Sequence, residues 1–91
     1  MFKLLKIDGV VFPVSEVQAV SRIIDDYVHG PDTYRKVFKV VLKGGLEVPW
    51  TGALQYRELT PQSFECQRAA EVARQQIIDV VWPNSTYVLQ I

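Results

Sequence analysis

The stretch from Ile23 to Phe38, IIDDYVHGPDTYRKVF, is nearly symmetrical about its centre, HGPD. Folding the chain back at HGPD sets tyrosine against tyrosine, acids against bases, and aliphatic residues against aliphatic or aromatic ones. The pairs are Val28 with Thr33, Tyr27 with Tyr34, Asp26 with Arg35, Asp25 with Lys36, Ile24 with Val37, and Ile23 with Phe38. Such pairs each contribute roughly 0.2–1 kcal/mol, and several agree in this one register. The symmetry therefore predicts an antiparallel hairpin within residues 20–42.

A helix is the alternative for the first half of this region. The run Ser15–Gln18 fits a capping box, and Gly30-Pro31 would end a helix that covers residues 16–28. The β-branched content favours a strand, and the hairpin accounts for more of the residues. We therefore predict the hairpin, with the helix as the competing interpretation.

A second hairpin is predicted over residues 2–14. Asp8-Gly9 supplies the two positive φ angles of a tight turn, which pairs Ile7 with Val10 and Leu5 with Phe12. Pro13 would then lie at an edge or at the end of its strand, because it has no amide hydrogen to donate.

A third hairpin is predicted over residues 38–50, around Gly44-Gly45. A loop formed by Lys43, Gly44 and Gly45 pairs Leu42 with Leu46, Val40 with Val48, and Phe38 with Trp50. These side chains then share one face, whereas a turn of the two glycines alone would move one strand's apolar residues to the other face. The pattern therefore predicts the longer, bulged loop.

A long helix is predicted from about residue 61 to 81. Thr60-Pro61 is a good N-terminal signal, and Pro83 ends the helix. Its apolar stripe consists of Cys66, Ala69, Ala70, Ala73, Ile77, Val80 and Val81. With a last strand over residues 86–91, the prediction is one α+β domain, 1–91. It has a twisted, mostly antiparallel sheet of about five or six strands packed on this helix.

One face of the predicted sheet stays uncovered and is rich in aliphatic residues. The candidate interface consists of Val20, Ile24, Val37 and Val41 on this face, together with Ile78 on the helix, off its stripe. A contiguous apolar patch often marks an interface, so the pattern predicts a homodimer or higher oligomer, through this face or a sheet edge. The alternative is that long Lys and Arg side chains, or the terminal segments of the chain, cover these residues.

The segment from Trp50 to Leu59 has no clear period and is predicted to be a loop. Trp50, Tyr56 and Arg57 are residue types that dominate binding hot spots, so they form a candidate binding loop. Equally, the aromatic residues could close the edge of the core.

Charge argues against a strong nucleic-acid interaction. Ten basic residues balance ten acidic ones. A candidate basic face consists of Arg22, Arg35, Lys39 and Lys43, but acids share the region. Because affinity for nucleic acid depends on phosphate neutralisation, we expect at most weak binding.

Catalytic and metal chemistry find little support. Asp25, Asp26, His29 and Asp32 cluster in sequence, but the two adjacent aspartates point to opposite faces of a strand. Cys66 lies on the apolar stripe, far from the single histidine that could activate it. We predict no catalytic residues, no metal site and no cofactor.

Together these features predict a small non-enzymatic protein-interaction module, acting as an adaptor or inhibitor of a larger complex. The layout is similar to that of many short accessory proteins of bacteria and their phages. The lone cysteine and the charged first residues predict a cytoplasmic location and no membrane. The alternative functions are sequestration of a small anionic molecule or nucleotide and, third, weak nucleic-acid binding.

Overall fold

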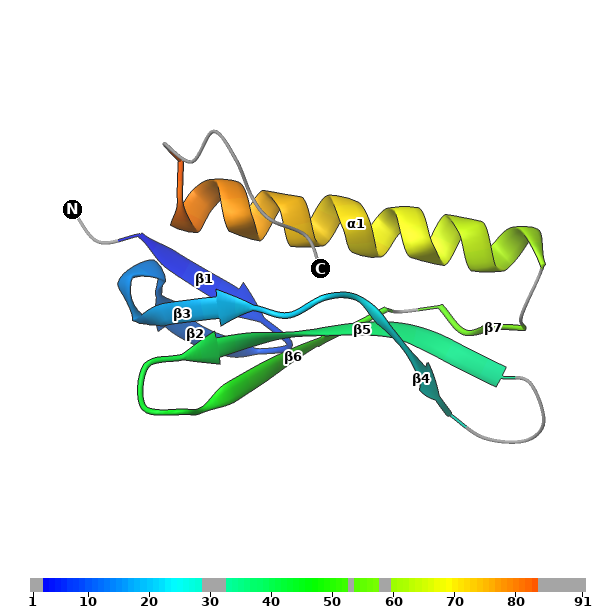
Figure 1. The fold of residues 1–91 in the computed structure, drawn as a ribbon, viewed down its shortest axis with the longest axis horizontal. Coiled ribbons are helices and arrows are strands. Elements are labelled where there is room, and N and C mark those ends of the chain that lie inside the picture. Colours follow the sequence, from blue (N-terminus) through cyan, green and yellow to red (C-terminus); the bar gives the residue numbers. More distant parts are fainter. Residues whose placement is uncertain (1–2, 29–32, 53, 58–59, 84–91) are drawn as a thin grey trace.

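A ten-residue central strand organises the molecule, and a computed structural model describes residues 3–28, 33–52, 54–57 and 60–83 of the chain. This strand is β5 (Thr33–Leu42). Antiparallel to it lie β3 (Val17–Val20) and β4 (Ile24–Tyr27) along one edge, and β6 (Glu47–Thr51) and β7 (Tyr56–Arg57) along the other. The helix α1 (Pro61–Val81) covers one face of this sheet (Figure 1). The predicted two-layer α+β architecture and the helix bounds are confirmed.

The symmetrical stretch forms a hairpin in the predicted register. Ladder pairs join Ile24 to Val37 and continue residue by residue to Tyr27 and Tyr34. The amide of Val28 also donates to the carbonyl of Thr33, at 3.0 Å. The competing helix over residues 16–28 is wrong, since the only helical turn there is the short 3₁₀ helix η1 (Val14–Glu16).

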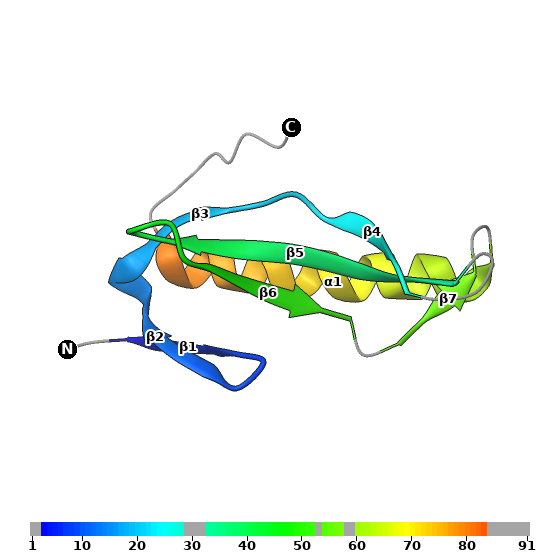
Figure 2. The same cartoon turned by 90° about the horizontal axis from the view of Figure 1, so that it is seen from below.

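The N-terminal hairpin, β1 (Leu4–Ile7) and β2 (Val10–Pro13), also has its predicted pairs and ends at Pro13. Asp8 and Gly9 have φ angles of 49° and 81°, as the tight turn requires. The two strands form a sheet of their own, which lies beyond the β6 edge of the main sheet (Figure 2).

The β5–β6 connection has the predicted three-residue loop. Val40 pairs with Val48 and Phe38 with Trp50, and the amide of Leu42 donates to the carbonyl of Leu46 at 2.7 Å. Gly44 and Gly45 both have positive φ angles, which favour glycine. Leu46 itself is 62% exposed, so it adds little to the buried apolar face that it was predicted to share with Val40 and Phe38.

The core lies between β5 and α1 and extends under the N-terminal hairpin. Phe38 and Val40 are fully buried, and the ring of Trp50 stacks on Phe38 with centroids 5.0 Å apart. Fully burying such a side chain stabilises the fold by roughly 1.5–3 kcal/mol. Ile7 and Phe12 complete this cluster from the hairpin side.

The buried side of α1 differs from the predicted stripe. Cys66, Ala70 and Ile77 are buried as predicted, but Ala69 and Val80 are exposed. Ile78, which the sequence placed off the stripe, is only 2% exposed. The small side chains of Cys66 and Ala70 let the first half of the helix approach the sheet. In the second half, the buried side of the helix includes Ile78 instead of Val80.

The strand opposite β5 is interrupted between β3 and β4, which the sequence did not predict. Ile24 pairs with Val37, but Val20 pairs with Val40, so the β3–β4 side has one extra residue. Ile23 therefore does not pair with Phe38. A one-residue shift moves side chains to the opposite face, which turns Val20 toward the helix.

Two segments, the one after Trp50 and the C-terminal one, were predicted to be a loop and a strand. The predicted loop after Trp50 contains the two-residue strand β7, because the chain returns to the same edge of the long β5. The predicted last strand, residues 86–91, lies outside the described residues. Within the described part of the chain, no helix is both long and apolar enough to cross a membrane.

Candidate functional site

The sheet face opposite α1 has no second layer among the described residues (Figure 2). Since Phe38 and Val40 point into the core, their neighbours on β5 point to this other side. We call it the open sheet face. By the observed register, it consists of Ala19, Ile24, Asp26, Arg35, Val37, Lys39, Val41, Glu47, Pro49 and Thr51.

The open sheet face combines an apolar row with an ion pair on each side of it. Ile24 and Val37 form the row across the strands. On one side the Nε atom of Arg35 lies 2.8 Å from Oδ2 of Asp26. On the other side, the Nζ atom of Lys39 lies 3.1 Å from Oε2 of Glu47. The face is therefore apolar at its centre and electrically balanced at its rim.

The five residues of the predicted interface do not all lie on this face. Ile24 is 44% exposed there and Val41 is half-buried. Val37 is on the face but only 7% exposed. The other two lie elsewhere. The β3–β4 interruption turns Val20 toward the helix, and Ile78 is a buried residue of α1 itself.

The predicted basic face is not assembled as a continuous surface. Arg35 and Lys39 are each paired with a carboxylate, and Lys43 lies in the β5–β6 turn. Arg22 lies in the β3–β4 interruption, beside the helix. The four bases therefore do not present unpaired charge on one surface.

The predicted binding loop is separated into core and surface. Trp50 stacks on Phe38 at the edge of the core, and Tyr56 is buried on β7. Arg57 is exposed, and its position next to Tyr56 on a strand turns its side chain to the opposite face. The two aromatic residues therefore serve the core.

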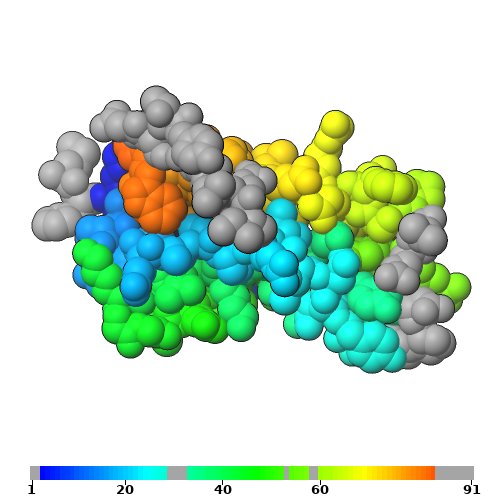
Figure 3. Space-filling view, viewed as in Figure 1, coloured from blue at the N-terminus to red at the C-terminus, as the bar shows by residue number. Residues whose placement is uncertain are grey.

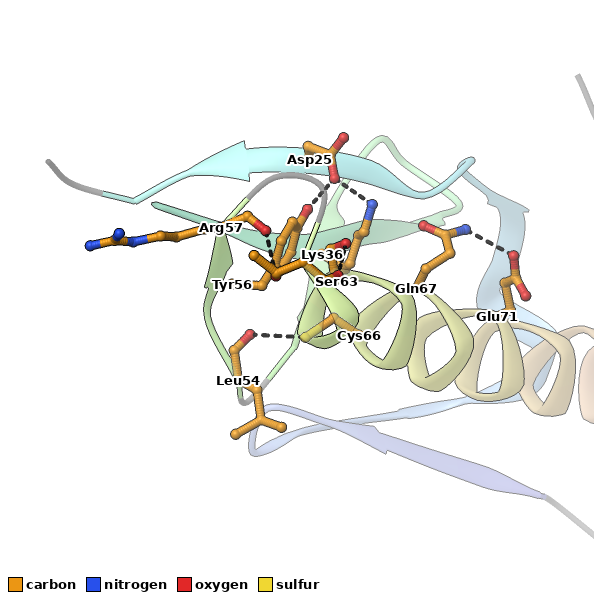
Figure 4. Close-up of polar contacts among 10 residues, drawn as sticks. Asp25, Lys36, Leu54, Tyr56, Arg57, Ser63, Cys66, Gln67 and Glu71 are labelled. Carbon is orange, nitrogen blue, oxygen red and sulfur yellow. Dashed lines mark hydrogen bonds and ion pairs between the residues drawn. The ribbon is translucent and has the colours of Figure 1, made fainter. Parts of the chain in front are cut away.

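A polar cluster under the first half of α1 unites Asp25, Lys36 and Tyr56 (Figure 4). The Tyr56 hydroxyl and the Lys36 ammonium both donate to Oδ1 of Asp25. The Lys36 Nζ atom also lies 5.2 Å from the centroid of the Tyr56 ring. Lys36, and then Tyr56, stabilise the carboxylate and lower the pKa of Asp25. The sequence paired Asp25 with Lys36 but missed Tyr56, because β7 was not predicted.

Cys66 lies close to this cluster, at the helix–β7 contact. Its Sγ atom is 3.7 Å from the carbonyl oxygen of Leu54, and burial, aided by the charge of Glu65, raises the pKa of the thiol (Figure 4). A protonated thiol is a poor nucleophile, so Cys66 acts as a small apolar residue.

No group of three or more His, Cys, Asp or Glu residues within the described ranges is arranged to hold a metal ion. His29 and Asp32 lie outside those ranges. Comparisons with protein-family models, with curated proteins and with solved structures find no match.

Proposed function

We propose that this protein is a small non-enzymatic interaction module of the cytoplasm that self-associates through its open sheet face. In this proposal the dimer acts as an adaptor or inhibitor of a larger complex, in the manner of an accessory protein. The observation that carries the proposal is the exposed Ile24, 44% exposed and paired with Val37, between two ion pairs of the open sheet face.

The distribution of polarity on the open sheet face supports an interface. Protein interfaces commonly have an apolar centre without unpaired charge and a polar rim. On this face, both basic groups are already neutralised by neighbours on the same face. Covering them with another protein surface would therefore bury no isolated charge, which is the costly case.

The arrangement of the charges favours a second copy of this chain as the partner. The bases Arg35 and Lys39 lie on the central strand, and the acids Asp26 and Glu47 lie on the strands beside it. When two such faces are stacked with a shift of one strand toward β4, Arg35 of each copy lies against Asp26 of the other. An isologous dimer of this kind is self-complementary.

The polar cluster of Asp25, Lys36 and Tyr56 supports a non-enzymatic role, because its side chains form hydrogen bonds with one another. Asp25 accepts hydrogen bonds from both Lys36 and Tyr56. This bonding links β4, β5 and β7 below the helix and leaves the carboxylate as a structural acceptor.

The test is the oligomeric state, measured by native mass spectrometry and light scattering. We expect the wild-type protein to be a dimer and Ile24→Lys to be a monomer, because the new charge would lie in the apolar row. The matched control is Val11→Lys, an exposed β-branched residue on the separate N-terminal sheet, which should leave the dimer intact.

A wild-type protein that stays monomeric throughout the concentration range would overturn self-association. Equal loss of the dimer in Ile24→Lys and Val11→Lys would place the interface elsewhere. Far-UV circular dichroism of both variants separates loss of association from loss of the fold.

A further inference from the structure

A polar cavity lies between the middle of α1 and the β3–β4 interruption. Its volume is about 550 Å³. Arg22 and Ile23 line it from the sheet edge, and Gln67, Glu71, Arg74 and Gln75 line it from the helix. In Figures 1 and 3 this connection (cyan) is seen below the middle of the helix (yellow), and Figure 2 shows that it runs along the edge of the sheet. The cavity is on the helix side of the molecule and does not involve the open sheet face.

The position of Arg74 beside the cavity depends on an exchange of hydrogen bonds at Ser21. The amide of Ser21 donates to the carbonyl of Lys39 at 2.8 Å, as in a regular antiparallel pair. The return bond is different, because the Lys39 amide donates to the Ser21 hydroxyl oxygen, at 2.7 Å. The Ser21 carbonyl is thereby available to accept from Nε of Arg74, also at 2.7 Å.

This bond fixes the guanidinium of Arg74 through one of its five donors. Among the described residues, neither Arg74 nor Arg22 forms an ion pair with a carboxylate. The one acid of the cavity wall, Glu71, accepts a hydrogen bond of 2.9 Å from Gln67. Two guanidinium groups and one carboxylate therefore give the wall a net positive charge.

We propose that this cavity binds a small molecule through an oxyanion group, a carboxylate or a phosphate, held between Arg22 and Arg74. Guanidinium groups bind both kinds of oxyanion through paired N–H donors. The volume lies within the range of small-molecule sites, roughly 300–1,000 Å³. The side chain of Arg74 is half-buried and held by Ser21, so part of the site is formed before the ligand arrives.

Isothermal titration calorimetry tests the site with inorganic phosphate and with citrate as separate probes, at constant ionic strength set by chloride. We expect saturable binding of at least one probe, and the two titrations distinguish a phosphate from a carboxylate site. Arg22→Gln and Arg74→Gln should each weaken binding about tenfold or more, since hydrogen bonds to charged groups contribute strongly.

Arg68→Gln is the matched control, because Arg68 is an exposed arginine of the same helix that does not line the cavity. It should change the affinity by less than about twofold. Arg74→Lys keeps the charge but loses the planar donors, and should also bind weakly.

Absence of saturable binding for both probes would overturn the site. So would an equal loss in Arg68→Gln, which would indicate diffuse attraction to surface charge. Arg22 makes no described side-chain bond within the fold, so Arg22→Gln tests the site without endangering folding.

Discussion

Asp25 illustrates how one side chain connects three strands. Its Oδ1 atom accepts from Lys36 on β5 and from Tyr56 on β7, while Asp25 itself lies on β4. The side chain of Lys36 is only 13% exposed, so its ammonium group needs a nearby counter-charge. The carboxylate supplies that charge and is stabilised in return, which is why the pKa of Asp25 is lowered from its ordinary 3.8.

This lowered pKa predicts how stability changes in acid. A carboxylate with a lowered folded pKa contributes stability that is fully present above its unfolded pKa and is lost as the pH falls through the folded value. We expect Asp25→Asn to be less stable than wild type at neutral pH. The gap should begin to narrow below about pH 3.8, where the unfolded carboxylate takes up a proton, and should close as the pH falls through the lower pKa of the folded state.

Urea unfolding from neutral pH down to about pH 2 measures this gap. Tyr56→Phe, which removes one of the two donors, should show part of the same pH dependence. A gap between wild type and Asp25→Asn that stays constant through the acid range would contradict the assignment.

The hairpin of β4 and β5 makes its own prediction through the pair of Asp26 and Arg35. The side chains of Asp26 and Arg35 are 40% and 41% exposed, so water partly screens their attraction. Asp26→Arg places two bases opposite each other and should destabilise the fold by up to about 1 kcal/mol. Adding Arg35→Asp reverses the pair and should restore much of the loss.

A double-mutant cycle in urea measures this coupling. Combining Asp26→Arg with Lys43→Asp, a charge change in the distant β5–β6 turn, should give simple additivity. Zero coupling between the substitutions at Asp26 and Arg35 would contradict the pairing.

The hairpins were predictable because their registers depend on neighbouring residues in the sequence. Charge and aromatic pairs set the β4–β5 register, and the requirement that Val40 and Val48 share a face set the β5–β6 loop. The β3–β4 interruption had no such signal. It depends on the Ser21 hydroxyl accepting from Lys39 and on Arg74, 53 residues away, bonding to Ser21. That single shift moved Val20 and Arg22 from their predicted places.

Two other features, β7 and the cavity, were not predicted because they too depend on contacts between residues far apart in the sequence. β7 has only two residues, too few for a period to be recognised, and its position is set by the free edge of β5. The cavity between Arg22 and Arg74 exists only where the helix crosses the interrupted strand. The sequence thus predicted the layers and most registers. Of the five predicted interface residues, three lie on the open sheet face: Ile24, Val37 and Val41.

The whole molecule has two sheets but one core. The strands of the N-terminal hairpin do not pair with the main sheet, yet its residues Ile7 and Phe12 pack in the same cluster as Phe38 and Ile77. An isolated two-stranded hairpin is marginally stable in water, so β1 and β2 depend on this packing. The core in turn would be open beside β6 without them. We therefore expect both sheets and the helix to unfold together.

Phe12→Ala tests that dependence. The ring is 5% exposed, and replacing a buried phenylalanine with alanine costs about 3–5 kcal/mol. That is a large part of the 5–15 kcal/mol that stabilises a typical domain. Val11→Ala, on the same strand but with a side chain 55% exposed, is the matched control and should change stability by less than about 0.5 kcal/mol.

Urea unfolding of Phe12→Ala is followed by two probes. Far-UV circular dichroism reports the helix, and tryptophan fluorescence includes Trp50. If the core is shared, the two transitions will coincide and will occur at a lower urea concentration than in wild type. A loss below about 1 kcal/mol, or a fluorescence transition separate from that of the helix, would mean that the two sheets fold independently.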